Sequence, residues 1–146
     1  IRERKPEISL GTDIIVGFCS ETEEQFNDTV ELYKECDFDI SYIAQYSYRT
    51  HTVANKAFKD DVPKYMKKER WKILQNLMEE IVKRKNQKYV NGIVSALVDK
   101  WDNGFCFGNS LEMKRVRFKG EQEIEGKIID VRILRAEEWI LHGEKI

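Results

Sequence analysis

The sequence predicts an α/β segment and an all-β segment joined by a long helix. Two observations lead to this fold class. Before about residue 62, two apolar runs flank one helical pattern, as in the strand–helix–strand units of parallel sheets. After Gly92 the apolar residues recur at every second position, and turn residues separate five short segments. The 146 residues are therefore expected to form three parts, 1–62, 63–91 and 92–146.

The first part has the pattern of one parallel crossover. Residues 8–18 (ISLGTDIIVGF) have the continuous apolar character of a parallel strand covered on both faces. A helix is predicted next, in SETEEQFNDTVELYKEC, where Ser20 and Glu23 have the spacing of a capping box. Residues 39–47 alternate as a second strand. Because two parallel strands are not stable alone, this part is expected to belong to a larger α/β domain or to need a partner.

The middle part predicts one helix over residues 63–89. Pro63 suits the first helical turn, and Asn91 with Gly92 suits the end. The helix is long enough to link two domains. Its predicted apolar stripe consists of Met66, Ile73, Leu74, Leu77, Met78 and Ile81.

The last part predicts a five-stranded antiparallel barrel of the OB-like kind. Ile129, Val131 and Ile133 are expected to point inward. The five predicted strands are GIVSALVDKW, FCFGN, KRVRFKG, GKIIDVRIL and EWILHGE.

The net charge of −1 hides an uneven distribution. Residues 1–50 carry 5 basic and 11 acidic side chains, whereas residues 51–92 carry 11 basic and 5 acidic ones. A basic helix can attract nucleic acid or can simply be a solvated face, and both interpretations stay open. No apolar run approaches the roughly 18–20 residues of a membrane span, and the N-terminus lacks the pattern of a signal peptide. A cytoplasmic protein with no membrane partner is expected, and the sequence leaves the oligomeric state open between a monomer and larger assemblies.

Candidate sites are few. Three widely spaced cysteines and two histidines predict neither a disulfide framework nor a metal site, and no nucleophile–base pair is visible, so no catalytic residue is predicted. Gly17 follows a strand, where it either lets a ligand approach the backbone or only makes the turn. In the barrel, Arg115 and Arg117 share the outer face and Lys114 precedes them, a pattern of RNA-binding strands or of an ordinary solvated strand.

Five segments, in order, resemble the radical-SAM methylthiotransferases. TDIIVGFCSETEEQF is similar to a strand and helix of their catalytic barrel, and FDISYIAQYSYRTHTVANK to the region that follows. DDVPKYMKKERWKILQNLMEEIVKRKNQKYVNG resembles their linker helix. FGNSLEMKRVRFKG and GKIIDVRILRAEEWILHGE resemble the TRAM domain with which these enzymes end. The similarity covers nearly the whole chain.

The resemblance implies an enzyme that adds a methylthio group with S-adenosylmethionine and two [4Fe-4S] clusters. Residues 1–62 would end the radical-SAM partial (β/α) barrel, and residues 92–146 would be the RNA-binding TRAM barrel. The backbone of Ile15–Gly17 would line the adenine of S-adenosylmethionine. The family's CxxxCxxC cluster motif is missing, which implies that this chain is the C-terminal part of the enzyme and is not active alone.

The resemblance also implies a substrate. Arg49 in YSYRTHT matches the branch that acts on tRNA, whereas enzymes acting on a ribosomal protein usually have Glu there. The TRAM stretch is similar to that of enzymes that modify isopentenylated adenosine beside the anticodon, although Asn109, Met113 and His51 depart from the family pattern. The expected partner is the tRNA anticodon stem-loop, and the expected RNA-binding residues are Arg49, Lys114, Arg115 and Arg117. The alternatives are an RNA-binding module without catalysis and the ribosomal-protein branch.

Overall fold

The chain divides into two compact units. The computed structural model describes residues 1–6 and 8–146. One unit is Leu10–Glu79, and the other combines Ile1–Ser9 with Glu80–Ile146. Helix α3 (Lys64–Asn86) contributes its first part to one unit and its last part to the other. No helix within the described residues combines the length and apolar character needed to cross a bilayer. The assignment of residues 1–62, 63–91 and 92–146 to parts of a longer enzyme stays a prediction.

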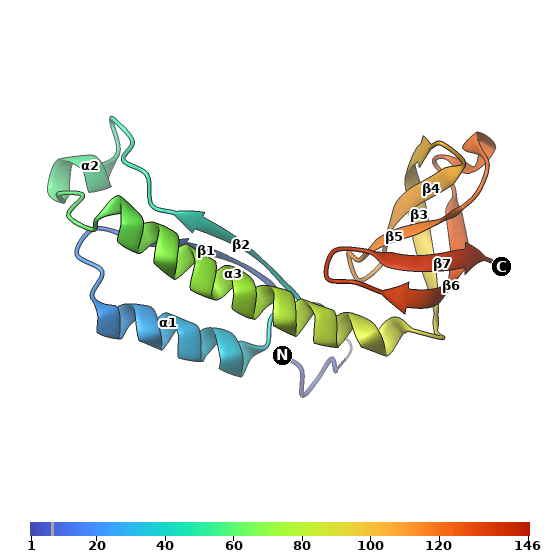
Figure 1. Ribbon diagram of the computed structural model, residues 1–146, viewed down its shortest axis with the longest axis horizontal. Helices are drawn as coiled ribbons and strands as arrows, with labels where there is room; N and C mark the ends of the chain where they lie inside the picture. Colours follow the sequence, from blue (N-terminus) through green and yellow to red (C-terminus); the bar gives the residue numbers. More distant parts are fainter. Residues whose placement is uncertain (7) are drawn as a thin grey trace. The chain divides into compact units, whose positions relative to one another are not determined.

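The unit Leu10–Glu79 contains the predicted strand–helix–strand. Strands β1 (Gly11–Val16) and β2 (Ile40–Gln45) pair in parallel, and helix α1 (Glu23–Cys36) connects them (Figure 1). Side chains that face the helices, such as Ser41, are buried, whereas Ile15 and Tyr42 are 58% and 69% exposed. The expectation that the first strand is covered on both faces is therefore wrong for this chain, because helices cover one face only.

Helix α1 begins two residues later than the predicted capping box. Thr22 is the N-cap: its hydroxyl accepts a hydrogen bond from the Gln25 amide at 3.2 Å, and the Gln25 side chain accepts one from the Thr22 amide at 3.0 Å. Ser20 instead has a φ of 63° and donates its amide to Asp61 Oδ1 at 2.7 Å. The predicted box of Ser20 and Glu23 is wrong because Ser20 forms a turn that a distant carboxylate holds.

Helix α3 begins one residue after the predicted start at Pro63, and the last three predicted residues form a 3-10 helix instead. The buried face of α3 is not purely apolar. Leu74 and Met78 are buried as expected, whereas Ile73 is 49% exposed. Two cations, Lys67 and Arg70, lie on the buried face instead. The indole of Trp71 donates a hydrogen bond to the Ile43 carbonyl at 2.8 Å, which fixes α3 against β2.

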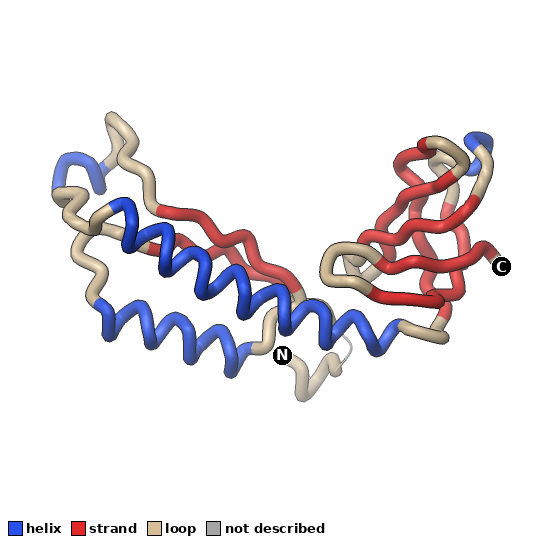
Figure 2. The backbone as a smooth tube through the Cα atoms, in the orientation of Figure 1, coloured by secondary structure: helices blue, strands red, loops and turns tan. Residues whose placement is uncertain are grey.

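The second unit contains the predicted barrel. Figure 2 shows its strands in red, and they form a closed sheet in the order β3-β4-β5-β7-β6. One short 3-10 helix, Gln87–Tyr89, precedes β3, and another, Gln122–Ile124, follows β5. The five strands are β3 (Ile93–Asp102), β4 (Phe105–Ser110), β5 (Arg115–Lys119), β6 (Ile128–Ala136) and β7 (Leu141–Lys145).

One pair of strands in the barrel is parallel. Four neighbouring pairs are antiparallel, but β5 and β7 run in the same direction, with Arg117 opposite His142. The expectation of an entirely antiparallel barrel is wrong for a geometric reason. Strand directions cannot alternate around a closed ring with an odd number of members, so at least one pair in a five-stranded barrel must be parallel.

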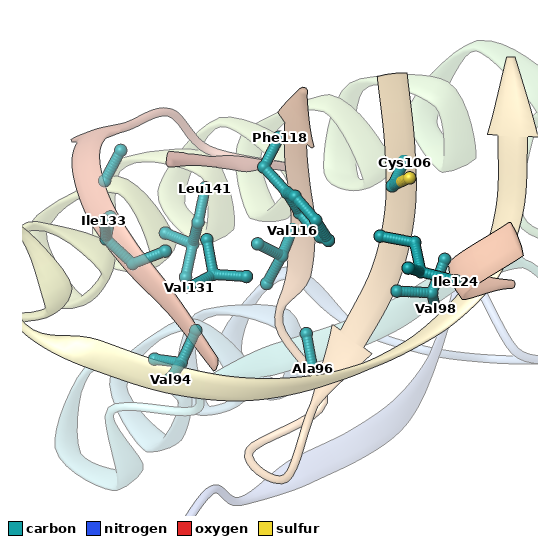
Figure 3. Close-up of a cluster of buried hydrophobic side chains, with 11 residues drawn as sticks. Val94, Ala96, Val98, Cys106, Val116, Phe118, Ile124, Val131, Ile133 and Leu141 are labelled. Atoms are coloured by element: carbon teal, nitrogen blue, oxygen red, sulfur yellow. The ribbon is translucent and has the colours of Figure 1, made fainter. Parts of the chain in front are cut away.

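The interior of the barrel is a closed apolar core. Val131 and Ile133 are fully buried and Ile129 packs against them partly buried, which confirms the predicted inward row on β6. Phe118, Val116 and Leu141 fill the same interior (Figure 3). Because alternate residues of β5 point inward, Arg115 and Arg117 lie on the outside, as the alternation predicts.

Replacing Gly143 by alanine is expected to destabilise the barrel by about 1–3 kcal/mol, the usual range for overpacking. An added Cβ would lie 2.4 Å from the Arg132 carbonyl oxygen and 2.5 Å from Val131 Cγ1, so the backbone of β6 would have to move. Hydrogen-exchange protection of the β6 and β7 amides measures the loss. Lys145→Ala, an exposed change on the same strand, should leave the protection within about 0.5 kcal/mol of wild type, and an equal loss there would contradict the explanation.

Candidate functional site

The carboxyl ends of β1 and β2 form a pocket that we call the strand-end pocket. It has a volume of about 260 Å³, and its lining includes Ile15, Ala44, Tyr46, Arg49 and Thr52. Ligands of parallel α/β sheets bind at this end of the strands. The structure thus brings Ile15 and Arg49 together in one pocket, although separate parts of the sequence predicted them as site residues.

A local network of hydrogen bonds shapes the rim of the strand-end pocket. The Thr52 hydroxyl donates to the Arg49 carbonyl at 2.9 Å and caps helix α2 (Val53–Ala57) by accepting from the Asn55 amide at 3.2 Å. The Tyr48 hydroxyl donates to Asn55 Oδ1. The Arg49 guanidinium is exposed and has no hydrogen-bond or ion-pair partner among residues 1–6 and 8–146. It is therefore free to bind an anion.

Gly17 lies outside the lining of this pocket and has a structural role. Its φ is 70°, and its amide donates to Glu21 Oε2 at 2.7 Å. A Cβ there would lie 2.4 Å from Lys67 Cγ, so the lysine stem occupies the space beside the glycine. These contacts agree with the interpretation of Gly17 as a turn residue, and its contact with a cofactor stays a prediction.

The structure shows two buried cations that the sequence interpretation missed. Lys67 Nζ donates to Asp60 Oδ1 at 2.5 Å and to the Tyr46 carbonyl at 3.3 Å. Arg70 Nη1 donates to Glu21 Oε2 at 2.6 Å and to the Glu21 carbonyl at 3.1 Å. Both cations thus hold the loops that follow β1 and β2. Their helical spacing from Leu74 is the one signal that could have placed them on the buried face.

Two pKa shifts report on the same loops. The Ser20 amide lowers the pKa of the Asp61 carboxyl, because its hydrogen bond stabilises the charged form. The hydrogen bond with Cys19 raises the pKa of Tyr46, so this phenol stays neutral at pH 7. The Tyr46 ring also packs edge-on against Phe18, with centroids 4.9 Å apart. The end of β1 is therefore fixed to the segment after β2 by both polar and aromatic contacts.

The predicted RNA-binding residues of the barrel have three different environments. Arg115 Nη1 pairs with Asp99 Oδ2 at 2.5 Å. The Arg117 guanidinium lies over the Phe105 ring, 3.7 Å from its centroid. Lys114 is only 7% exposed, and its backbone amide donates to the Ser110 hydroxyl at 3.3 Å. Arg117 is thus the most available cation of the three.

The residues present do not form an iron–sulfur site. Cys19, Cys36 and Cys106 are thiols that form no disulfide with described residues, and they lie after β1, at the end of α1 and in β4. In the part of the chain that the structure describes, no three His, Cys, Asp or Glu side chains come together as metal ligands. Iron–sulfur clusters need several thiolates at one place, and the described residues do not supply them.

Comparison with known proteins gives one consistent result. No protein-family profile matches the chain. It is 44% identical over 149 aligned residues to the tRNA-2-methylthio-N(6)-dimethylallyladenosine synthase of Bacillus subtilis, covering 100% of this chain and 29% of that protein. The protein of the same name is 40% identical in Geobacillus kaustophilus and 38% identical in Thermosipho melanesiensis, where the chain covers 28% and 34% of the relative. The chain thus spans about a third or less of the length of these relatives. It is a relative of the tRNA-2-methylthio-N(6)-dimethylallyladenosine synthases and corresponds to their C-terminal part.

Proposed function

We propose that this chain is the tRNA-holding part of a methylthiotransferase that acts on adenosine beside the anticodon. The observation that carries the proposal is the similarity of the whole chain to proteins named for this reaction on tRNA. The closed five-stranded barrel supports it, because small barrels of this kind commonly bind nucleic acid. In this proposal the unit with β1 and β2 is the last strand–helix–strand of a radical-SAM partial barrel, and the other unit is a TRAM barrel.

The strand-end pocket is proposed as part of the wall of the S-adenosylmethionine site in the cytoplasmic full-length enzyme. Its place at the carboxyl ends of parallel strands supports this, as does the exposed apolar side chain of Ile15. S-adenosylmethionine and two [4Fe-4S] clusters would supply the radical and the methyl group. The contribution of Ile15 and Ala44 would be to exclude water along one edge of the cofactor.

The proposed contacts with tRNA come from both units. Arg49 at the rim of the strand-end pocket has free donors for a phosphate or for the face of a base. On the barrel, the proposed contact is Arg117 on the outer face of β5. Arg115 on the same face is already paired with Asp99, and buried Lys114 would support the strand end from which both arginines extend. These side chains would select a tRNA over a ribosomal protein through their contacts with RNA. RNA binding is therefore the direct test.

The test is a titration of the full chain with an anticodon stem-loop RNA at several salt concentrations. We expect the logarithm of the binding constant to fall linearly with the logarithm of the salt concentration, because cations of the protein displace counterions from RNA phosphates. Binding that does not change with salt, or no binding at all, would contradict the proposal.

Replacing Arg49 by glutamate is expected to weaken stem-loop binding by about tenfold, or about 1.4 kcal/mol, through repulsion of a phosphate. The matched control is Lys56→Glu, because Lys56 is an exposed cation on the neighbouring helix α2 and its reversal changes the net charge equally. Equal losses for the two variants in the same titration would show that only the overall charge matters, and would remove Arg49 as a specific contact.

A further inference from the structure

We propose that the groove between β5 and β7 is the site of one RNA backbone phosphate, held by Arg117, Lys119 and Lys145. The inference rests on the proposed RNA-binding function and assigns it to a particular place on the barrel. The groove has a volume of about 340 Å³. Besides these three cations, its lining includes Phe105, His142 and Glu144.

The parallel pairing of β5 and β7 creates this arrangement. Arg117 lies opposite His142, and Phe118 lies opposite Gly143. Because Phe118 and Leu141 point into the core, their neighbours Arg117 and His142 point outward. By the same alternation Lys119, His142 and Glu144 share the outer face with Arg117. Lys145 lies opposite the inward-pointing Val131 and lines the groove at the end of β7.

The side chains of the three groove cations have no acidic partner. Among the described residues, no side chain of Arg117, Lys119 or Lys145 makes a hydrogen bond or an ion pair. The Arg117 guanidinium lies over the Phe105 ring, with Cζ 3.7 Å from the ring centroid, and this contact restricts the side chain before any ligand binds.

The carboxylate in the groove lining, Glu144, already has a cation partner, because its Oε1 lies 3.5 Å from Arg132 Nη1. The imidazole Nε2 of His142 lies 3.5 Å from Glu137 Oε2. Three free cations thus surround a space that contains one carboxylate, and that carboxylate already has a partner. A phosphate matches this site because its oxygens can accept hydrogen bonds from a guanidinium and from ammonium groups at the same time.

Arg115 provides an internal comparison, because it lies on the same strand but is neutralised. Its guanidinium pairs with Asp99, and Asp99 also accepts a hydrogen bond from Asn109 Nδ2 at 3.2 Å. A phosphate near Arg115 would meet the negative charge of Asp99. The sequence predicts the same role for both arginines, but in the structure Arg115 has an acidic partner and Arg117 has none among the described residues. Only Arg117 therefore belongs to the phosphate site.

The experiment compares single variants of the full chain in stem-loop titrations over a range of salt concentrations. Arg117→Gln, Lys119→Gln and Lys145→Gln should each lower the affinity about threefold to tenfold and reduce the salt slope by about 1. Arg115→Gln, the matched control, should change the slope by less than half of that. Hydrogen exchange of the barrel core checks that each variant is folded, and the two exposed lysines keep the test valid if Arg117→Gln disturbs Phe105.

A second measurement separates RNA phosphate from free phosphate. Inorganic phosphate, added at constant ionic strength, should compete with the stem-loop for the wild-type protein and should not compete in the Lys119→Gln/Lys145→Gln variant. If phosphate binds without displacing RNA, the groove is a site for free anions and the inference is overturned.

The remaining outcomes distinguish the two proposals. If the wild-type chain binds RNA but the groove variants keep its affinity and salt slope, the inference is wrong and the proposed function stands. If Arg115→Gln loses as much as Arg117→Gln, the contact is diffuse and the inference is also wrong. If the wild-type chain does not bind the stem-loop, the proposed function itself fails.

Discussion

Replacing Arg70 by methionine is expected to destabilise the unit Leu10–Glu79 by about 3–5 kcal/mol, the range for breaking one side of a buried ion pair. The Arg70 side chain is 3% exposed and its partner Glu21 is 13% exposed, so water replaces the lost donor only in part. Arg70 also donates to Glu23 Oε2 at 3.1 Å and lies over the Phe26 ring. Methionine keeps the apolar packing but leaves the Glu21 carboxylate without its cation.

Hydrogen exchange of the α1 and β1 amides measures this loss without mixing it with the stability of the barrel. Lys72→Met is the matched control, because Lys72 is an exposed cation on the same helix and its replacement should cost less than about 0.5 kcal/mol. The double variant Arg70→Met/Glu21→Gln should recover part of the stability, since it removes the unpaired charge. Without any recovery, the effect of Arg70 would be one of packing and the explanation would be wrong.

Replacing Phe118 by alanine is expected to destabilise the barrel by about 3–5 kcal/mol, because it leaves a cavity in the core. Phe118 is 1% exposed and lies in the cluster that Figure 3 shows. The same residue lies behind the β5–β7 groove, so the loss should also weaken RNA binding.

Protection of the β3–β7 amides against hydrogen exchange measures the stability change. Phe107→Ala is the comparison, because Phe107 is a half-buried ring on the outer face of β4 and should cost clearly less. Phe118→Leu, which keeps most of the volume, should lie between Phe118→Ala and wild type. An equal cost for Phe107→Ala would mean that the barrel does not depend on its interior core.

The strands of the barrel could be predicted from the sequence because their alternation is local. Within each strand, the alternation of apolar residues indicates which side chains face inward, as for Val131 and Ile133. The pairing of β5 with β7 is not local, and no residue pattern within either strand indicates its partner. Lys119 and Lys145 were therefore not predicted as site residues, because their common groove exists only once these two strands pair.

In the unit Leu10–Glu79, the strands and the helix between them could be predicted from the sequence. Which faces of the sheet other elements cover could not be predicted. Parallel pairing of β1 and β2 follows from the helix between them, whereas exposure of Tyr42 depends on which elements pack on the sheet. Arg70 and Glu21 are 49 residues apart, and a helical stripe cannot show that a cation on it meets such a partner. The sequence did predict Ile15 and Arg49, and the structure brings both into the strand-end pocket.

The odd number of strands has a consequence for how the barrel assembles. Strands β3, β4 and β5 are neighbours in both sequence and sheet, as are β6 and β7, so each group can form through short loop closures. The barrel is complete only when these groups meet along two seams, β3–β6 and β5–β7, and such distant pairings slow folding. The proposed phosphate site crosses the second seam. A bound RNA would therefore slow the separation of strands β3–β5 from strands β6–β7, because it binds only the closed barrel.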